Sequence, residues 1–573
     1  MSPRVRRGLE AAAIFAVVVV VLATTAHSYG LGYDEPVYMS RAQEASEWLD
    51  VLTSNPGAAM GDGGIRRFWD ARSEQQPGFL KLWGAVTTPI VAGRLPTLAA
   101  LRFGTHLLVG MACAALYLLT ASVWGRLEGV AAVGALMTLP RTFAHAHLFA
   151  LDAPVMAATF ISLALFYEAA RHRSWGWAAA GAAVWGVALS IKVNAFFIPL
   201  IVVPWMAFYA RDTLLRATAC GLTLAPLTFV ATWPWLWHDT LARLGSYMAF
   251  HFRHWQIHVT YFGERYALAP WHFPIVMTAI TTPIITSLAA IAGAARTLKE
   301  SVVGEPSGWR ERWQDEGFRR RALGALLGWA LLINFVMNSL PDTPKYNGVR
   351  LFQPVFPLIA LLAGVGIGWL ARMGRAWFEE RREQVGERLP RISALLIVAL
   401  VLAPPMRSVL SYHPHQLSYY NALIGGLSGA AEAGMEPTYW GETYLDGALW
   451  LNEHAEAGSV VWIEPPGVEA TMRMYQQMGI LRSDLRTTAG EDALANADYA
   501  IFQNKSTEFS DYARELLSSR QPCGTIEEHG VPLLYVFCNR DLTPSVPLSV
   551  PEEGEEKVRS DGVHQLTEKG EAQ

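Results

Sequence analysis

The sequence predicts an α-helical polytopic membrane protein with about eleven transmembrane helices and a small α/β domain after them. Hydrophobic residues make up 52% of the 573 residues, and charged residues make up only 17%, whereas soluble domains have about 25% charged residues. The apolar residues come in blocks close to 20 long, a length that crosses the hydrocarbon core of a bilayer as a helix. Lysine and arginine gather in alternate loops between these blocks, which is typical of a multi-span membrane protein.

The apolar blocks define the predicted helices in chain order. The first block follows the basic stretch MSPRVRRGLE, and we interpret it as an uncleaved helix with a cytoplasmic N-terminus rather than a signal peptide. This orientation puts the two segments richest in Lys and Arg, 296–321 and 372–391, on the cytoplasmic side. The sequence therefore predicts a multi-pass protein of the inner (cytoplasmic) membrane, with the bilayer as a partner. The predicted spans are 9–29, 99–122, 126–142, 150–170, 176–191, 194–210, 215–232, 271–295, 322–340, 351–371 and 392–410.

An odd number of spans leaves the C-terminal region outside the cytoplasm. The membrane domain is predicted to cover 1–411, with a long first outer loop over 30–98. In 412–545, the strand-like stretches SVVWIEP, DYAIFQ and VPLLYVFC alternate with helix-like stretches, which predicts an extracytoplasmic α/β domain. Cys523 and Cys538 bracket a predicted hairpin there, and both a disulfide and two free thiols fit the spacing. The polar segment 546–573 is predicted to be a disordered tail.

Charged and polar residues that are unusual beside apolar helices fall on the predicted outer side. The first outer loop opens with LGYDEPVYMS, which sets Asp34 and Glu35 side by side, and Lys81 follows in the same loop. Charges beside membrane helices are usually paired or functional, so we expect one polar cavity at the outer face. Taken singly, Asp34 is also typical of the start of a helix. Lys81 taken singly is also typical of a lysine whose ammonium group extends to the membrane–water interface. The remaining members of the set are Arg141, His145, His147, Asp152, Lys192, Asn194, His251, His254, His258, Glu264, Asp342, Lys345 and Arg350.

The charge pattern excludes some function classes. The net charge is -4 and no basic stripe stands outside the membrane-flanking loops, so we expect no nucleic-acid partner. A transporter of a lipid-linked or anionic substrate would also place charges among membrane helices, and it is the alternative interpretation. The charges cluster on one face instead of running through the midplane, and paired interrupted helices in two halves are not seen. This pattern favours an enzyme.

The ordered motifs resemble those of a known family. After the acidic pair come a Pro-Gly-x-x-Lys loop that ends at Lys81, a DAP helix start at 152–154, a Lys-x-Asn at 192–194 and a Y-x-G-x-R at 346–350. Over roughly residues 5–410 this order resembles the polyprenyl-phosphate-dependent membrane glycosyltransferases of the C-type fold. The protein O-mannosyltransferases (glycosyltransferase family 39) and the bacterial enzymes that add aminoarabinose to lipid A are the nearest kin. The family's loop usually carries a second Pro where this chain has Gly78.

The resemblance implies a reaction and a set of site residues. A hexosyl or pentosyl sugar would move from a polyprenyl-phosphate donor to a hydroxyl of a protein, lipid or glycan acceptor, by single displacement with inversion. The resemblance maps Asp34 as the general base, with Glu35 and Asp152 as the other catalytic acids. It places Lys81 at the donor phosphate, and the negative charge of the leaving phosphate suggests Lys192 and Arg350 as further cations there. No cofactor is required by this mapping, while a divalent cation stays an open alternative and its ligands are unknown. Accessory candidates are His145, His147, Lys345 and Glu264.

Overall fold

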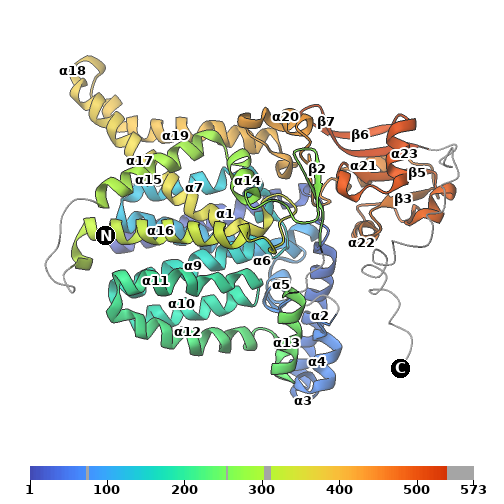
Figure 1. Ribbon diagram of the computed structural model, residues 1–573, viewed down its shortest axis with the longest axis horizontal. Coiled ribbons are helices and arrows are strands. Elements are labelled where there is room, and N and C mark those ends of the chain that lie inside the picture. The colour runs from blue at the N-terminus through green and yellow to red at the C-terminus, as the bar shows by residue number, and fades with distance from the viewer. Residues whose placement is uncertain (73–75, 253–255, 302–311, 539–573) are drawn as a thin grey trace.

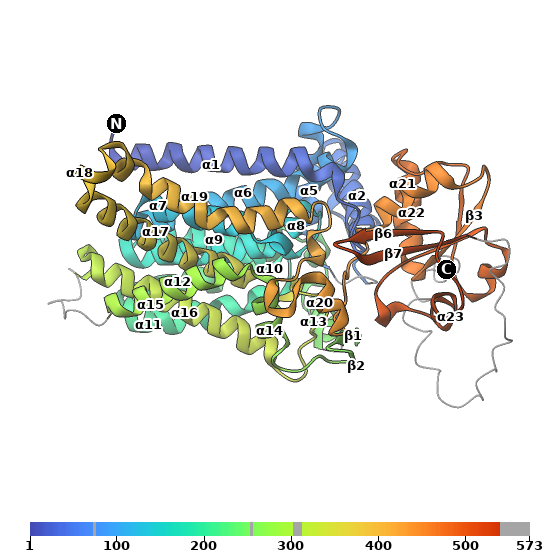
Figure 2. The same ribbon diagram turned by 90° about the horizontal axis from the view of Figure 1, so that it is seen from above.

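The computed structural model describes residues 1–72, 76–252, 256–301 and 312–538, so His254 and the predicted tail 546–573 lie outside the described residues. Most of the membrane region is a bundle of helices that run roughly parallel, with the N-terminus at one end and a separate sheet region at the other (Figures 1 and 2). The bundle helices are α1 (Pro3–Thr25), α6 (Thr97–Val123), α7 (Arg126–Met137), α9 (Asp152–His172), α10 (Trp175–Leu189), α11 (Ile198–Tyr209), α12 (Arg211–Ala231), α15 (Ile284–Ser301), α16 (Glu316–Ser339), α17 (Phe356–Glu380) and α19 (Arg388–Ser411).

Each predicted span coincides with helical structure, but the helices differ in length. Among the described residues, seven helices are long and apolar enough to cross a membrane, or eight if one bent pair counts as a span. The eleven predicted spans correspond to these seven helices, the bent pair and three shorter helices. The predicted span 271–295 is broken between α14 (Phe273–Thr281) and α15, whose axes differ by 113°. The predicted spans 126–142, 176–191 and 194–210 correspond to shorter helices, with α7 only 12 and α10 only 15 residues long.

The basic segments predicted to share one side do meet at one end of the bundle. This is the end that carries the N-terminus and the short α18 (Arg382–Val385), opposite the sheet region (Figure 2). Polar contacts join the segments there, as the predicted alternation of sides requires. They are Arg126 with Glu10 (2.8 Å), Arg171 with Ser122 (3.1 Å), Arg173 with Asp212 (2.6 Å), Arg320 with the Val123 carbonyl (3.4 Å), and Arg372 with Glu128.

The first outer loop is itself helical and lies across the opposite end of the bundle. It contains α2 (Glu35–Ser54), α3 (Pro56–Met60), α4 (Asp62–Trp69) and α5 (Phe79–Val91), and α13 (Thr240–Phe252) packs beside it (Figure 1). A small apolar core holds these elements together, and its largest members are Trp48, Trp69, Trp233 and Trp235. The loop is thus a fixed platform from which α2 presents its first residues to the bundle.

The C-terminal sheet confirms the predicted α/β region. Its strand order is β4 (Arg486–Thr488), β3 (Val460–Glu464), β5 (Tyr499–Gln503), β7 (Val531–Cys538) and β6 (Gly524–Glu528). β3 runs parallel to β4 and β5, whereas β7 is antiparallel to β5 and β6. Successive side chains of a strand point to opposite faces, so both faces need a cover. Helices α21 (Tyr444–His454) and α22 (Glu469–Gln477) contribute to the apolar core on one face, and α23 (Asp511–Ser519) contributes to the core on the other.

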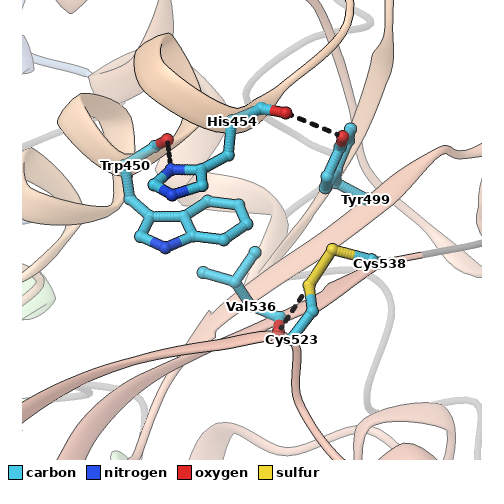
Figure 3. The surroundings of a disulfide bond; sticks show 6 residues. All are labelled: Trp450, His454, Tyr499, Cys523, Val536 and Cys538. Carbon is cyan, nitrogen blue, oxygen red and sulfur yellow. Dashed lines mark hydrogen bonds between the residues drawn. A yellow bond between two sulfur atoms is a disulfide. The ribbon is translucent and has the colours of Figure 1, made fainter.

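A disulfide closes the last hairpin of this sheet. Cys523 precedes β6 and Cys538 ends β7, and the two sulfurs are bonded with their Cα atoms 5.7 Å apart (Figure 3). The backbone N–H of Cys523 also donates to the Val536 carbonyl at 2.9 Å. The structure therefore decides between the two alternatives that the spacing left open. The other two cysteines, Cys113 and Cys220, are free and buried in the bundle.

Candidate active site

Four charged residues from four separate segments form one ion-paired cluster at the end of the bundle nearest the sheet. Arg350 donates from Nη2 to Asp34 Oδ2 at 2.5 Å and from Nε to Asp152 Oδ2 at 3.0 Å. Lys192 donates from Nζ to the other oxygen of Asp152, also at 2.5 Å. We name these four residues the charge cluster. Its two carboxylates and two cations cancel formally, which makes a buried cluster tolerable in a low-dielectric setting.

Every member of the charge cluster lies where a helix begins or ends. Asp34 immediately precedes α2, and Asp152 is the first residue of α9. Lys192 is extended, between α10 and the 3-10 turn Val193–Phe197, while Arg350 opens the 3-10 turn that leads into α17. Apolar helix interiors cannot host unpaired charges, so the shared end of several helices is where such a cluster can form.

Exposure differs strongly within the charge cluster. The Asp152 side chain is 0% exposed, and Arg350 and Lys192 are 10% and 16% exposed. Asp34 is 37% exposed, although it binds the same Arg350. Both oxygens of Asp152 are used by cations. Asp34 is therefore the carboxylate of the pair that an incoming molecule can reach.

The loop that carries Arg350 is pressed against aromatic side chains. Gly348 has a φ of +61°, and a Cβ on it would come within 2.7 Å of both the Tyr439 ring and the Arg141 guanidinium. Only glycine fits this position without strain, which explains the Gly of the Y-x-G-x-R motif. Tyr346 of the same motif lies near Asp34 and Arg350, and burial raises the pKa of its phenol to about 12. Its hydroxyl is therefore protonated at neutral pH.

The C-terminal region closes over the charge cluster. The Arg350 guanidinium stacks on the ring of Trp440, 4.1 Å from the ring centre, and such a contact stabilises a desolvated cation. The Tyr33 N–H donates to the Trp440 carbonyl at 3.0 Å, and the Tyr33 hydroxyl reaches Glu508 at 2.7 Å. Lys505 donates to the Asn347 side chain at 2.9 Å. Two stretches of the C-terminal region, around Trp440 and Lys505, thus hold the loops that supply Asp34 and Arg350.

Glu35 does not join the charge cluster, although the sequence places it beside Asp34. Its carboxylate receives two hydrogen bonds from Arg102, at 2.9 and 2.7 Å, and a third from the Phe149 N–H at 2.6 Å. Both charged side chains of this pair are 0% exposed. The guanidinium of Arg102 also donates to three backbone carbonyls of 26–30. The position of Glu35 is therefore that of a residue that fixes the start of α2.

Lys81 is buried at the start of α5. Its Nζ donates to the Gln76 carbonyl at 3.3 Å, within the Pro-Gly loop. The Phe79 N–H at the beginning of α5 donates to the Ser190 carbonyl at 3.1 Å, two residues before Lys192. The loop of Lys81 is thus attached to the segment that carries one cation of the charge cluster.

The four accessory candidates have different surroundings. His145 is buried next to the charge cluster, its Nε2 lies 3.0 Å from the Tyr439 hydroxyl, and burial lowers its pKa to about 3. His147 instead stacks on Tyr29 with ring centres 4.1 Å apart. The Lys345 ammonium donates to two carbonyls of its own loop, at 2.8 Å each. Glu264 lies in the hairpin of β1 (Val259–Tyr261) and β2 (Glu264–Tyr266), where it accepts from the Tyr266 hydroxyl. The structure therefore brings only His145 to the cluster.

Comparison with known proteins supports the family that the motifs suggest. Residues 90–238 match the family model described as dolichyl-phosphate-mannose-protein mannosyltransferase. The matched range runs from the end of α5 to the 3-10 turn that follows α12. Asp152 and Lys192 lie inside the matched range, whereas Asp34 and Arg350 lie outside it. No curated protein sequence matches the chain.

Several solved structures are similar to this chain. ArnT from Cupriavidus metallidurans in the apo state is 15% identical, with a TM-score of 0.49 over 92% of this chain and 97% of that chain. The same protein bound to undecaprenyl phosphate is 14% identical, with a TM-score of 0.46 and coverages of 94% and 99%. The apo oligosaccharyltransferase of Archaeoglobus fulgidus is 12% identical, with a TM-score of 0.47 and coverages of 85% and 69%.

The residues of the charge cluster do not suit a divalent cation. No group of three or more His, Cys, Asp or Glu side chains that could hold a metal ion occurs in the part of the chain that the structure describes. Both carboxylates of the charge cluster already accept hydrogen bonds from cations. A divalent ion prefers several carboxylate or carbonyl oxygens that face no competing positive charge.

Three residues that shape the site were not among the predicted site residues. Arg102, Tyr439 and Trp440 contact Glu35, His145 and Arg350 respectively. An arginine inside an apolar helix usually has a charged partner or a function. Arg102, in the second apolar block, could have been recognised in this way. Tyr439 and Trp440 lie far along the chain in a region read as a separate domain, where composition does not distinguish them from core aromatics.

Proposed function

We propose that the protein transfers a sugar from a polyprenyl-phosphate donor to an acceptor hydroxyl, at the outer face of the inner membrane, by single displacement with inversion. The family match supports a lipid-linked donor, since the family's description names a dolichyl-phosphate sugar. One observation carries the assignment of roles. Within a single ion-paired cluster, one carboxylate is open and the other is enclosed by two cations.

Arg350 and Lys192 receive the donor phosphate in this proposal. The bond between the anomeric carbon and the phosphate oxygen breaks with its electron pair on the phosphate, so negative charge grows there in the transition state. Fixed cations in a dry site stabilise that growing charge more than they stabilise the intact donor. The two cations are already held in place by Asp152. Lys81 completes the phosphate site from the loop attached to the Lys192 segment.

Asp34 acts as the general base. The acceptor hydroxyl gives its proton to the free carboxylate oxygen of Asp34 while its oxygen bonds to the anomeric carbon, opposite the departing phosphate. A carboxylate in hydrogen-bond reach supplies roughly 10²- to 10⁴-fold in rate. The 2.5 Å contact with Arg350 fixes the orientation of Asp34. Asp152, whose oxygens are both engaged, is a positioning residue for the two cations, and Glu35 positions Asp34 by anchoring α2.

The proposed location follows from the arrangement of the bundle ends. The basic segments gather at the end away from the charge cluster, and the positive-inside rule assigns that end to the cytoplasm. The disulfide lies in the region beside the charge cluster, and disulfides persist in oxidising compartments outside the cytoplasm. Both observations support an extracytoplasmic site and C-terminal region.

The test uses the purified full-length protein, a polyprenyl-phosphate sugar and a membrane extract as acceptor source. Asp34→Asn should fold, with an unchanged thermal unfolding midpoint, and release polyprenyl phosphate about 10²- to 10⁴-fold more slowly. Asp50→Asn removes an exposed acid from the same helix and should behave as wild type. Full activity of Asp34→Asn would refute the proposed base.

The sequence also left a transporter as an alternative interpretation, and the same assay tests it. Transfer gives polyprenyl phosphate and a glycosylated acceptor in equal amounts. Movement of intact donor across sealed vesicles, without any release of polyprenyl phosphate, would instead establish the transporter.

A further inference from the structure

A groove lies at the end of the bundle opposite the charge cluster. It has a volume of about 600 Å³ and is formed by the start of α1, the second halves of α6 and α9, and the start of α10. Asp152 and Arg171, near the two ends of α9, are about 29 Å apart at roughly 1.5 Å per residue. The groove is therefore separated from the candidate active site by nearly the thickness of a bilayer's hydrocarbon core.

The walls of the groove are apolar and open to the side of the bundle. Leu118 of α6 is 41% exposed and Trp177 of α10 is 42% exposed, and Ile161 and Leu165 of α9 lie between them. Helix sides in this bundle face lipid, so these exposed apolar surfaces suit an acyl chain and not water. A tryptophan at this depth is typical of the level of the lipid head groups.

The rim of the groove is positively charged. The charged or titratable residues that line the groove are Arg4, Arg7, Arg171 and His172, with one acid, Glu168. Glu168 is already engaged by Arg171 at 3.3 Å and by His172 at 3.0 Å, and Arg171 is also held by Ser122. The three arginines against one glutamate leave a formal charge of +2 at the rim when the histidine is neutral. A phosphate at the mouth of an apolar groove would meet this charge directly.

We propose that this groove binds one anionic phospholipid from the leaflet opposite the catalytic cluster. Its phosphate would lie among Arg4, Arg7 and Arg171, and one acyl chain would run along Leu118, Ile161 and Leu165. The positive charge of the groove favours an anionic head group. The apolar wall favours a ligand that has an acyl chain, which a free phosphate lacks. The proposal uses the groove alone and does not rest on the proposed reaction.

The test is native mass spectrometry of the full-length protein in detergent, with dioleoyl phosphatidylglycerol or dioleoyl phosphatidylcholine added. Phosphatidylglycerol should be retained in preference to phosphatidylcholine. The double variant Arg4→Gln/Arg7→Gln should hold phosphatidylglycerol roughly thirtyfold more weakly, from about fivefold for each basic residue. The matched control is Arg375→Gln/Arg381→Gln, on α17 and at the residue that follows it. It loses the same charge at the same end of the molecule and should bind as wild type.

Two further arms separate a lipid groove from a charged surface. Leu118→Trp fills the groove without changing its charge and should also weaken retention of phosphatidylglycerol, with an unchanged thermal midpoint of the lipid-free protein. Soluble glycerol 3-phosphate should not displace the bound lipid. Equal retention of both lipids, an equal loss in the control variant, normal binding by Leu118→Trp or displacement by glycerol 3-phosphate would each overturn the proposal.

Discussion

Asp34 and Glu35 are neighbours in the chain and have opposite surroundings. Asp34 is 37% exposed and shares Arg350 with Asp152. Glu35 is 0% exposed and is bound by Arg102 and by backbone N–H groups. Successive side chains at the start of a helix are rotated by about 100° around the helix axis, so adjacent residues face different partners. The acidic pair therefore splits into one reactive candidate and one anchor.

Glu35→Gln tests that division. The variant leaves the fully buried Arg102 without its counter-charge, and breaking a buried pair in this way costs about 3–5 kcal/mol. We expect a clear fall of the thermal unfolding midpoint in detergent. Glu47→Gln, an exposed acid on α2, serves as the control and should leave the midpoint unchanged. A Glu35→Gln protein as stable as wild type yet inactive would instead make Glu35 a functional acid.

Asp446 gives a pH-dependent prediction. Burial raises its pKa to about 6, and burial lowers the pKa of His415, 3.8 Å away, to about 4. The pair is thus largely neutral between these values and is not an ion pair. Because the folded-state pKa of Asp446 exceeds its ordinary value, the stability it contributes is present at low pH and is lost as pH rises through about 6.

Asp446→Asn should remove that loss. Relative to wild type, the variant should gain stability on the order of 1 kcal/mol between about pH 5 and about pH 8. Thermal unfolding across this pH range measures the difference. The exposed Asp511→Asn should show a difference from wild type that does not vary with pH. A pH-independent difference for Asp446→Asn would contradict the assignment.

At the scale of elements, the site depends on how the C-terminal region meets the loop before α17. Trp440 stacks on Arg350, and Tyr439 with Arg141 occupies the space that a side chain at Gly348 would need. Tyr33 is held by Trp440 and Glu508 on the side of α2. The C-terminal region therefore sets the orientation of the loops that supply both Asp34 and Arg350.

Trp440→Leu should lower kcat/KM by up to about 30-fold, because a desolvated cation–π contact contributes up to about 2 kcal/mol. Steady-state kinetics with the lipid-linked donor measures the change. Trp440→Phe keeps an aromatic face for Arg350 and should recover most of the loss. If Phe and Leu were equally impaired, the ring's role would be packing and not support of the cation.

The sequence predicted the four members of the charge cluster because each stands at the end of an apolar block. The predicted alternation of loops then places all four on the same side of the membrane. The pairing of Glu35 with Arg102 was not predictable, since the partners are 67 residues apart and are brought together by the packing of the segment before α2 against α6. Helix breaks were also missed. The mean hydropathy of the segment 271–295 stays high across Thr282 and Pro283, so it does not reveal that the chain turns by 113° there.

At the scale of the whole molecule, the predicted alternation of sides is matched by two groups of loops at opposite ends of the bundle. The group at the N-terminal end is joined by arginine contacts such as Arg173 with Asp212. The group at the other end holds the charge cluster and packs against the C-terminal region. Single-cysteine labelling tells which of these ends faces the cytoplasm.

Ser54→Cys on α2 should react with a membrane-impermeant maleimide in intact cells, and Arg382→Cys on α18 should react only after the cells are permeabilised. The background is low, because Cys113 and Cys220 are buried and Cys523 is bonded to Cys538. The reverse labelling pattern would invert the proposed orientation and move the site to the cytoplasmic face.

The span of the charge cluster along the chain has a consequence for biosynthesis. Asp34 and Arg350 are 316 residues apart, and Trp440 comes later still. A nascent chain whose first helices are already inserted exposes Asp34 without its cation and without the aromatic cover. If the proposed roles hold, catalytic competence arises only when synthesis has passed Trp440. A chain truncated before Arg350 would keep Asp34, Lys81 and Lys192 but would lack the cation that joins the two carboxylates, so it would not transfer the sugar.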